Sequence, residues 1–321
     1  MEKVVCACGA SALELYRSSK RLIPTLLDKP RTGQVTGLSV PPRQLLADDM
    51  TVHGIVSKPY HVLVDGNRGY NQRQDIQVTA CYRPLPPRSL IKIDRSFWTV
   101  SPELSFIQIA GDNTWSNFDI ISLGYELCGT YVLDDSWDGL TCTEKPLTST
   151  EKIGRLTDSI HRVTGIKRAR NLLKYVNGLS NSPMETVLAM LVSLPTTMGG
   201  LGLGPISMNH PVATPVGRRR VDIGFTRQRV GLEYQGKEFH SIEAAGRDAR
   251  RQNKIVGSGF TILNVWYEDL VDEHLFQQFT DDLFRALGSR KRIRTSGFHT
   301  LQKILRMQLM PTVTRYGGDE F

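Results

Sequence analysis

Two acids in the stretch 218–236, RRRVDIGFTRQRVGLEYQG, have the spacing of a metal site. The stretch predicts a β-hairpin, because apolar and polar residues alternate along both of its arms. A turn at Arg227 and Gln228 then places Asp222 directly opposite Glu233. The Cβ atoms of directly paired residues lie roughly 4.5–5.5 Å apart. Two carboxylates at that separation repel unless a charge neutralises them, and a divalent cation is the usual solution.

The same register assigns every side chain of the hairpin to a face. One face is expected to carry the apolar residues Val221, Ile223, Phe225, Val230, Leu232 and Tyr234. The other face carries the two acids, and Gln235 follows Glu233 there because side chains alternate with period two. Two other interpretations of the acids stay open. They can belong to a solvated outer face, or they can form ion pairs with the neighbouring arginines.

Composition indicates a soluble globular chain with room for two domains. The chain has 321 residues, of which 40% are hydrophobic and 22% charged. No apolar run approaches the length of a membrane span, and the first residues lack the long apolar segment of a signal peptide. The five cysteines are scattered and show no zinc spacing. Reduced thiols, a cytoplasmic location and no membrane partner are therefore expected.

Positive charge is concentrated in two places. The net charge of +8 favours a polyanionic partner. Arginines flank the hairpin acids, and the stretch 285–306 holds seven Lys or Arg residues and no acid. Either group would attract a phosphate backbone. A solvated basic face is the alternative for the second group.

Changes in pattern along the chain predict four segments. From residue 183 onward the expected order is helix, hairpin, basic helix, buried strand and helix, with the strand parallel to its neighbour. The class is α/β, with helices flanking a small mixed sheet. The segments are an α+β N-terminal domain over 1–140 (β-rich over 32–100, helical over 101–132), a helical linker over 141–180, an α/β domain over 181–290, and a basic C-terminal tail over 291–321.

This order resembles the PD-(D/E)XK nuclease superfamily, and more specifically the endonuclease-like domain related to very-short-patch repair (Vsr) enzymes. Those domains carry a helix acid, an Asp on a strand, an E-Y-D-G-like motif with a following His, a basic helix with an Asp-x-x-Arg pattern, and a strand. The matching pieces here, over about 182–287, are Glu185, Asp222, LEYQG with Glu233, His240, DARRQNK from Asp248, and FTILNVW. The resemblance implies a restriction-endonuclease-like fold for 181–290.

The resemblance also implies a site. Asp222, Glu233 and Glu185 would ligate Mg²⁺ or Mn²⁺, although Glu185 also suits a capping box behind Ser182. Contacts to nucleic acid would come from Arg218, Arg219, Arg220, Arg247, Arg250, Arg251 and Lys254.

One catalytic position departs from the superfamily. Gln235 stands where these enzymes carry Lys or, in this branch, an acid. A neutral amide neither activates water as lysine does nor binds a cation as an acid does. Lys237 on the same strand face, or Lys254, is the expected substitute, and His240 would transfer a proton or contact phosphate.

The implied function is Mg²⁺-dependent hydrolysis of DNA phosphodiester bonds, in phage defence or a toxin–antitoxin system. The longer run from VSPELSFIQIA to SPMETVLAMLVSLP is similar to proteins of AbiEi-type abortive-infection systems. The alternative is therefore a catalytically impaired regulator or antitoxin that binds nucleic acid, and a protein-interaction scaffold is a third interpretation. The expected partners are nucleic acid, DNA rather than RNA, and a cognate toxin or antitoxin. The sequence leaves the oligomeric state open.

Overall fold

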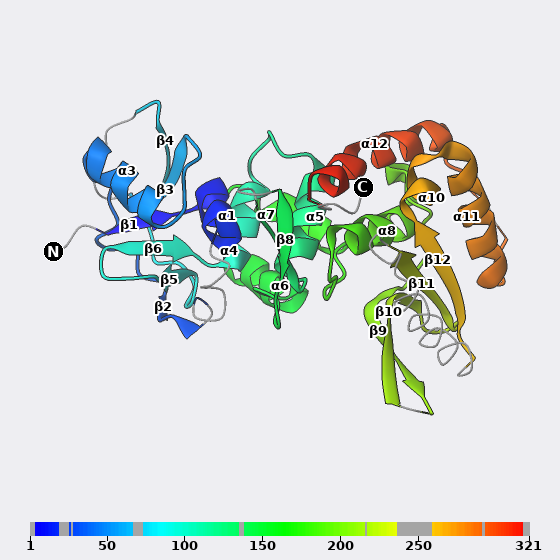
Figure 1. Ribbon diagram of the computed structural model, residues 1–321. Helices are drawn as coiled ribbons and strands as arrows, with labels where there is room; N and C mark the ends of the chain where they lie inside the picture. Colours follow the sequence, from blue (N-terminus) through cyan, green and yellow to red (C-terminus); the bar gives the residue numbers. More distant parts are fainter. Residues whose placement is uncertain are drawn as a thin grey trace. The chain divides into compact units, whose positions relative to one another are not determined.

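The computed structural model divides the chain into two compact units. It describes residues 4–18, 26, 28–66, 73–134, 138–215, 217–235, 259–290 and 293–316. Unit 1 comprises 1–128, 132–137 and 143–176, and unit 2 comprises 129–131, 138–142 and 177–321. The helices expected to link two domains over 141–180 thus fall mainly within unit 1. Both units combine sheets with helices, which confirms the α/β class (Figure 1).

Unit 1 is built on a six-stranded mixed sheet in the order β2-β5-β6-β1-β3-β4. Its strands are β1 (Val5–Ala7), β2 (Arg31–Thr32), β3 (Tyr60–Asp65), β4 (Ile76–Cys81), β5 (Leu90–Lys92) and β6 (Phe97–Val100). Its helices are α1 (Gly9–Ser18), α3 (Arg43–Val52), α4 (Pro102–Ile109), α5 (Asn117–Leu127), α6 (Thr150–Ser159) and α7 (Ile166–Leu173). A separate two-stranded sheet consists of β7 (Tyr131–Asp134) and β8 (Gly139–Cys142), and residues 138–142 belong to unit 2.

Unit 2 is built on a four-stranded sheet in the order β12-β11-β10-β9. Its strands are β9 (Ser207–Thr214), β10 (Gly217–Phe225), β11 (Val230–Gln235) and β12 (Thr261–Trp266). The helical elements are α8 (Pro183–Ser193), the 3₁₀ turn η1 (Thr196–Met198), α10 (Tyr267–Val271), α11 (Glu273–Ala286) and α12 (Phe298–Tyr316). Among these, α8 packs against both β10 and β11.

Short polar side chains begin several of these helices. Ser101 accepts a hydrogen bond from the backbone N of Leu104 at the start of α4. For α6 the cap is Ser149, whose Oγ accepts from the N of Lys152.

The hairpin register is confirmed near the turn. Ile223 pairs with Leu232 and Phe225 with Val230, antiparallel as predicted. The strand expected over 260–266 is β12, and it runs parallel to β11. The predicted basic helix between these strands lies outside the described residues.

The strand β9 was not predicted, because its sequence SMNHPVAT follows a glycine-rich run and contains a proline. It pairs antiparallel with β10, with Pro211 opposite Arg220. Proline lacks a backbone N–H and is tolerated mainly on edge strands. The position of β9 at the end of the sheet order fits that rule.

The segment expected to be a basic tail contains a long helix. α12 packs against α8 and η1, so much of 291–321 belongs to the body of unit 2. Within the described part of the chain, no helix is both long and apolar enough to cross a membrane.

Candidate functional site

Three neighbouring elements of unit 2 carry the acids that the sequence analysis selected. Glu185 lies in the first turn of α8, Asp222 on β10 and Glu233 on β11. The helix α8 packs on both strands, so the three elements that carry these acids are neighbours in unit 2. Glu185 and Glu233 are each only 8% exposed. A solvated outer face is therefore the wrong interpretation for Glu233.

Glu185 serves the start of α8 as well as the acidic region. Its backbone N donates to Ser182 Oγ at 3.1 Å, and its carboxylate Oε2 accepts from the backbone N of Asn181 at 2.8 Å. This is a variant of the expected capping box, since the carboxylate binds the residue before the cap. The two contacts fix the direction in which the side chain leaves the helix.

Burial makes Glu185 unusually hard to ionise. Desolvation, and after it the negative charge of Asp222, raises the pKa of Glu185 to about 8, against hydrogen bonds from Asn181 and Ser182 that lower it. The carboxyl group therefore holds its proton near neutral pH in the absence of a cation. The negative charge of Asp222 thus disfavours ionisation of Glu185. A raised carboxyl pKa produced by burial and a nearby acid is typical of functional sites.

Asp222 lies where the alternation of β10 is interrupted. A Cβ built on Gly231 would lie 3.2 Å from each methyl group of Val221, so these residues face the same side of the sheet. Leu232, next to Gly231, faces the opposite side together with its partner Ile223. Val221 and Ile223 thus lie on opposite faces, and the prediction of one apolar face for both is wrong.

The interruption also involves β9. The described ladder passes from the Val221–His210 pair directly to the Ile223–Met208 pair. Between them, Asn209 has a left-handed φ of 48°. This φ lies outside the extended region of a β-strand. The interruption accounts for Val221 and Ile223 facing opposite sides of the sheet, which the alternation of apolar residues in the sequence does not reveal.

Asp222 binds the backbone of the adjacent strand. Its Oδ2 accepts a hydrogen bond from the backbone N of Tyr234 at 2.8 Å. The cross-strand pairs of β10 and β11 run from Phe225–Val230 to Ile223–Leu232, so the expected direct pair of Asp222 and Glu233 is not part of this ladder. The hydrogen bond nevertheless holds the Asp222 carboxylate against β11.

Gln235 is held by Asn264, a residue of the expected buried strand FTILNVW. Gln235 Nε2 donates to Asn264 Oδ1 at 2.9 Å. Asn264 lies on β12 and pairs with Glu233 in the parallel ladder. An asparagine within the apolar run FTILNVW was the available signal for this position. The bond fixes the orientation of the Gln235 amide.

The structure describes only part of the predicted set of basic and proton-transferring residues. Arg218, Arg219 and Arg220 lie on β10, close in sequence to Asp222. The others fall outside the described residues: Lys237, His240, Arg247, Arg250, Arg251 and Lys254.

The described carboxylates are suited to a hard cation, although they form no large ligand cluster. Among the described residues, no group of three or more His, Cys, Asp or Glu side chains is placed to hold a metal ion. Two of the carboxylates, those of Glu185 and Asp222, lie on elements that pack on each other. Mg²⁺ commonly binds through one or two protein carboxylates, with waters and substrate phosphate completing its shell. Glu185 and Asp222 supply carboxylate oxygens from a helix and a strand that pack on each other, so the two residues fit such an ion.

No protein-family model, curated protein or solved structure matches this chain. The assignment of function therefore depends on the residues of unit 2 themselves.

Proposed function

We propose that unit 2 is a restriction-endonuclease-like domain that hydrolyses phosphodiester bonds in DNA with Mg²⁺ or Mn²⁺. The observation that carries the proposal is the buried Glu185 carboxyl on α8, a helix that packs on the strands β10 and β11, which carry Asp222 and Glu233. The order of acid-bearing helix, antiparallel hairpin and parallel strand also accords with the PD-(D/E)XK resemblance. A cytoplasmic location is part of the proposal and is consistent with five free cysteines.

Each acid has a distinct part in the proposed reaction. Asp222 and Glu185 would bind the cation, and Glu233 would support them from the adjacent strand. The bound ion would neutralise charge on the phosphate and lower the pKa of a coordinated water. The backbone N–H of Tyr234 orients Asp222, so that this carboxylate needs little rearrangement when the cation binds.

Replacement of Asp222 tests the proposal. Purified protein is incubated with plasmid and linear DNA in Mg²⁺, Mn²⁺ or EDTA. We expect chelator-sensitive cleavage that falls at least about 100-fold in Asp222→Asn, because the amide cannot supply an anionic ligand. The matched control is Glu268→Gln, which neutralises an exposed acid of the same unit. Full activity of the Asp222→Asn protein contradicts the proposal.

A second candidate is a nucleic-acid-binding regulator or antitoxin of AbiEi type that does not cleave. Gln235 favours this regulator, because its neutral amide, hydrogen-bonded to Asn264, stands where the superfamily that the chain resembles carries a charged side chain. Salt-sensitive DNA binding without cleavage in any metal would support this candidate. A toxin that co-purifies with the chain would strengthen it further.

A further inference from the structure

Part of β10 extends beyond the central sheet as a two-stranded ribbon. Within the described residues, positions 217–221 of β10 pair only with β9, whereas pairing with β11 begins at Ile223. We call residues 210–214 and 217–221 the β9–β10 ribbon. Five pairs at about 3.4 Å per residue give a length of roughly 14 Å. Figure 1 shows this hairpin projecting away from β11 and β12.

The two faces of the β9–β10 ribbon differ in exposure. On one face, Val212 and Val221 are buried and cluster with Phe260. Arg219, which pairs with Val212, is half-buried on that side. This face is therefore directed at the body of the unit.

The opposite face is exposed and has a particular composition. Arg218 pairs with Ala213 and Arg220 with Pro211, and all four residues are exposed. Arg220 donates to the backbone O of Asn209 at 3.2 Å, which holds its guanidinium along the ribbon. The face therefore presents two guanidinium groups beside two small apolar side chains, with no acid among its four residues.

The two-stranded form and the chemistry of this face match the major groove of B-form DNA. That groove is about 12 Å wide and about 8.5 Å deep, and it admits a two-stranded ribbon. Arginine binds the O6 and N7 atoms of guanine or a phosphate, and a small apolar side chain contacts the thymine methyl group. Duplex RNA is a poor fit, because its major groove is deep and narrow.

We infer that the exposed face formed by Pro211, Ala213, Arg218 and Arg220 docks the chain in the major groove of duplex DNA. Asp222 follows Arg220 on the same strand at a separation of roughly 7 Å. The β9–β10 ribbon would thus hold a phosphate backbone within reach of the acidic region. The inference rests on the proposed function only for this last step, since docking itself needs no cation.

Binding is measured by fluorescence anisotropy in EDTA, with labelled duplex DNA, duplex RNA and single-stranded DNA of one sequence. We expect the protein to bind duplex DNA more tightly than duplex RNA or single-stranded DNA. The double variant Arg218→Ala/Arg220→Ala should bind duplex DNA at least about tenfold more weakly. Its dependence on salt should also be shallower, because fewer counterions are released.

Two controls separate docking from charge alone and from misfolding. Arg95→Ala/Arg155→Ala removes the same charge from exposed positions of unit 1, and it should bind like the original protein. Circular dichroism and the thermal midpoint report whether each variant folds. A duplex whose cytosines carry bulky glucosylated hydroxymethyl groups fills the major groove and should bind weakly to the original chain.

The outcomes distinguish this inference from the proposed function. Equal affinity for duplex DNA and duplex RNA, or equal loss in both double variants, overturns the inference. If DNA is cleaved in an Asp222-dependent manner while the ribbon variants bind normally, the inference fails and the nuclease proposal stands. If binding depends on the β9–β10 ribbon but no metal supports cleavage, the nuclease proposal fails and the docking surface stands.

Discussion

Glu185 links the folding of unit 2 to the charge state of the candidate site. The native carboxyl keeps its proton up to a pKa of about 8, whereas the unfolded group releases it near 4.5. Between these values the unfolded state binds fewer protons, so stability falls as pH rises. The contribution of Glu185 to stability is fully present below the pKa of the unfolded group and is lost as pH rises through the pKa of the folded group.

The variant Glu185→Gln should remove this pH dependence, because the amide stays neutral and can still accept from the backbone N of Asn181. We expect the thermal midpoint of the variant to exceed that of the original protein by about 5 °C at pH 8, with little difference at pH 5. Scanning fluorimetry from pH 5 to 8 measures the thermal midpoints of both proteins. Mg²⁺ should reduce the difference between the two midpoints at pH 8. Parallel curves for the two proteins would show that Glu185 ionises normally.

Residue-level prediction succeeded where the local sequence carries the signal. The Ser182 cap and Glu185 at the third helical position are both visible in SPME. The facing of Val221 was not predictable, because the interruption at Asp222 depends on the backbone of Asn209 in another strand. The partner of Gln235 was hidden for the same reason, since Asn264 arrives from a strand distant in sequence.

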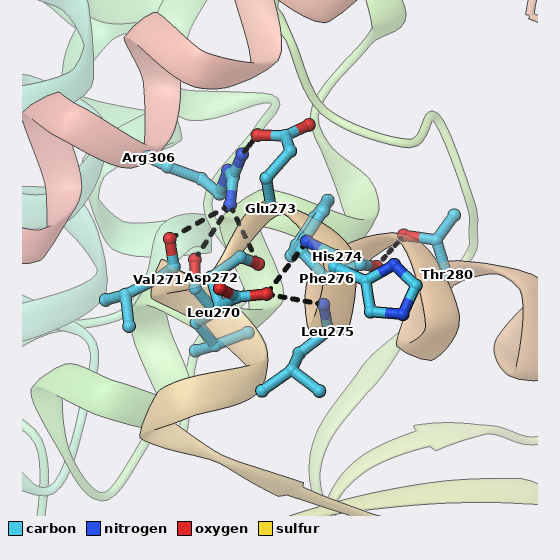
Figure 2. A network of polar contacts seen from close by, with 9 residues as sticks. All are labelled: Leu270, Val271, Asp272, Glu273, His274, Leu275, Phe276, Thr280 and Arg306. Atoms are coloured by element: carbon cyan, nitrogen blue, oxygen red, sulfur yellow. Dashed lines mark hydrogen bonds and ion pairs between the residues drawn. The ribbon is translucent and has the colours of Figure 1, made fainter.

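At the scale of elements, Arg306 fastens α12 to the junction of α10 and α11. Its guanidinium donates to the backbone O atoms of Leu270, Val271 and Asp272 and pairs with the Glu273 carboxylate (Figure 2). The group also lies 4.6 Å from the centre of the Phe276 ring. Those carbonyls end α10, where a helix favours positive charge.

Replacing Arg306 by Met should destabilise the protein by about 2 kcal/mol, because the carbonyls lose a charged donor while the apolar stem is largely retained. Urea unfolding measures the change. Lys303→Met, at an exposed position of the same helix, is the control and should change stability by less than about 0.5 kcal/mol. Equal effects would mean that the Arg306 contacts contribute nothing specific.

This contact also explains a limit of sequence reasoning about elements. Seven basic residues without an acid over 285–306 suggested a surface for polyanions. Composition does not distinguish an exposed arginine from one such as Arg306, whose side chain is 7% exposed. Strands with regular alternation were predicted well, whereas β9 was missed because its proline and preceding glycines imitate a loop.

For the whole molecule, the cysteines offer a test of how the two units bury their thiols. Cys6, Cys8 and Cys128 are buried, Cys81 is half-buried and Cys142 is exposed. Burial raises the pKa of both Cys8 and Cys128 to about 12. A thiol reacts as its thiolate, so these groups should be inert in the native protein.

Titration with an aromatic disulfide reagent at pH 8 should show one rapidly reacting thiol, assigned to Cys142. All five should react after unfolding in guanidinium. The variant Cys142→Ser should lose the rapid phase alone. A native protein in which three or more thiols react quickly would contradict the burial of these side chains.

The α/β class of the whole chain could be inferred from its periodicity, and the sheet order within unit 2 followed in part from the parallel relation of the strands. The grouping of chain segments could not. Residues 138–142 belong to unit 2 although 143–176 return to unit 1, and contacts between distant segments decide that division. Changes in composition along the sequence do not indicate that a short segment between two parts of unit 1 belongs to unit 2.

The edge strand β9 has a consequence for self-association. A sheet edge with a regular row of outward N–H and C=O groups can recruit the same edge of another molecule. In β9 that row is interrupted, because Pro211 has no N–H and Asn209 leaves the extended conformation. The proline that obscured this strand in the sequence, together with the left-handed backbone of Asn209, should therefore limit the growth of this edge into an intermolecular sheet.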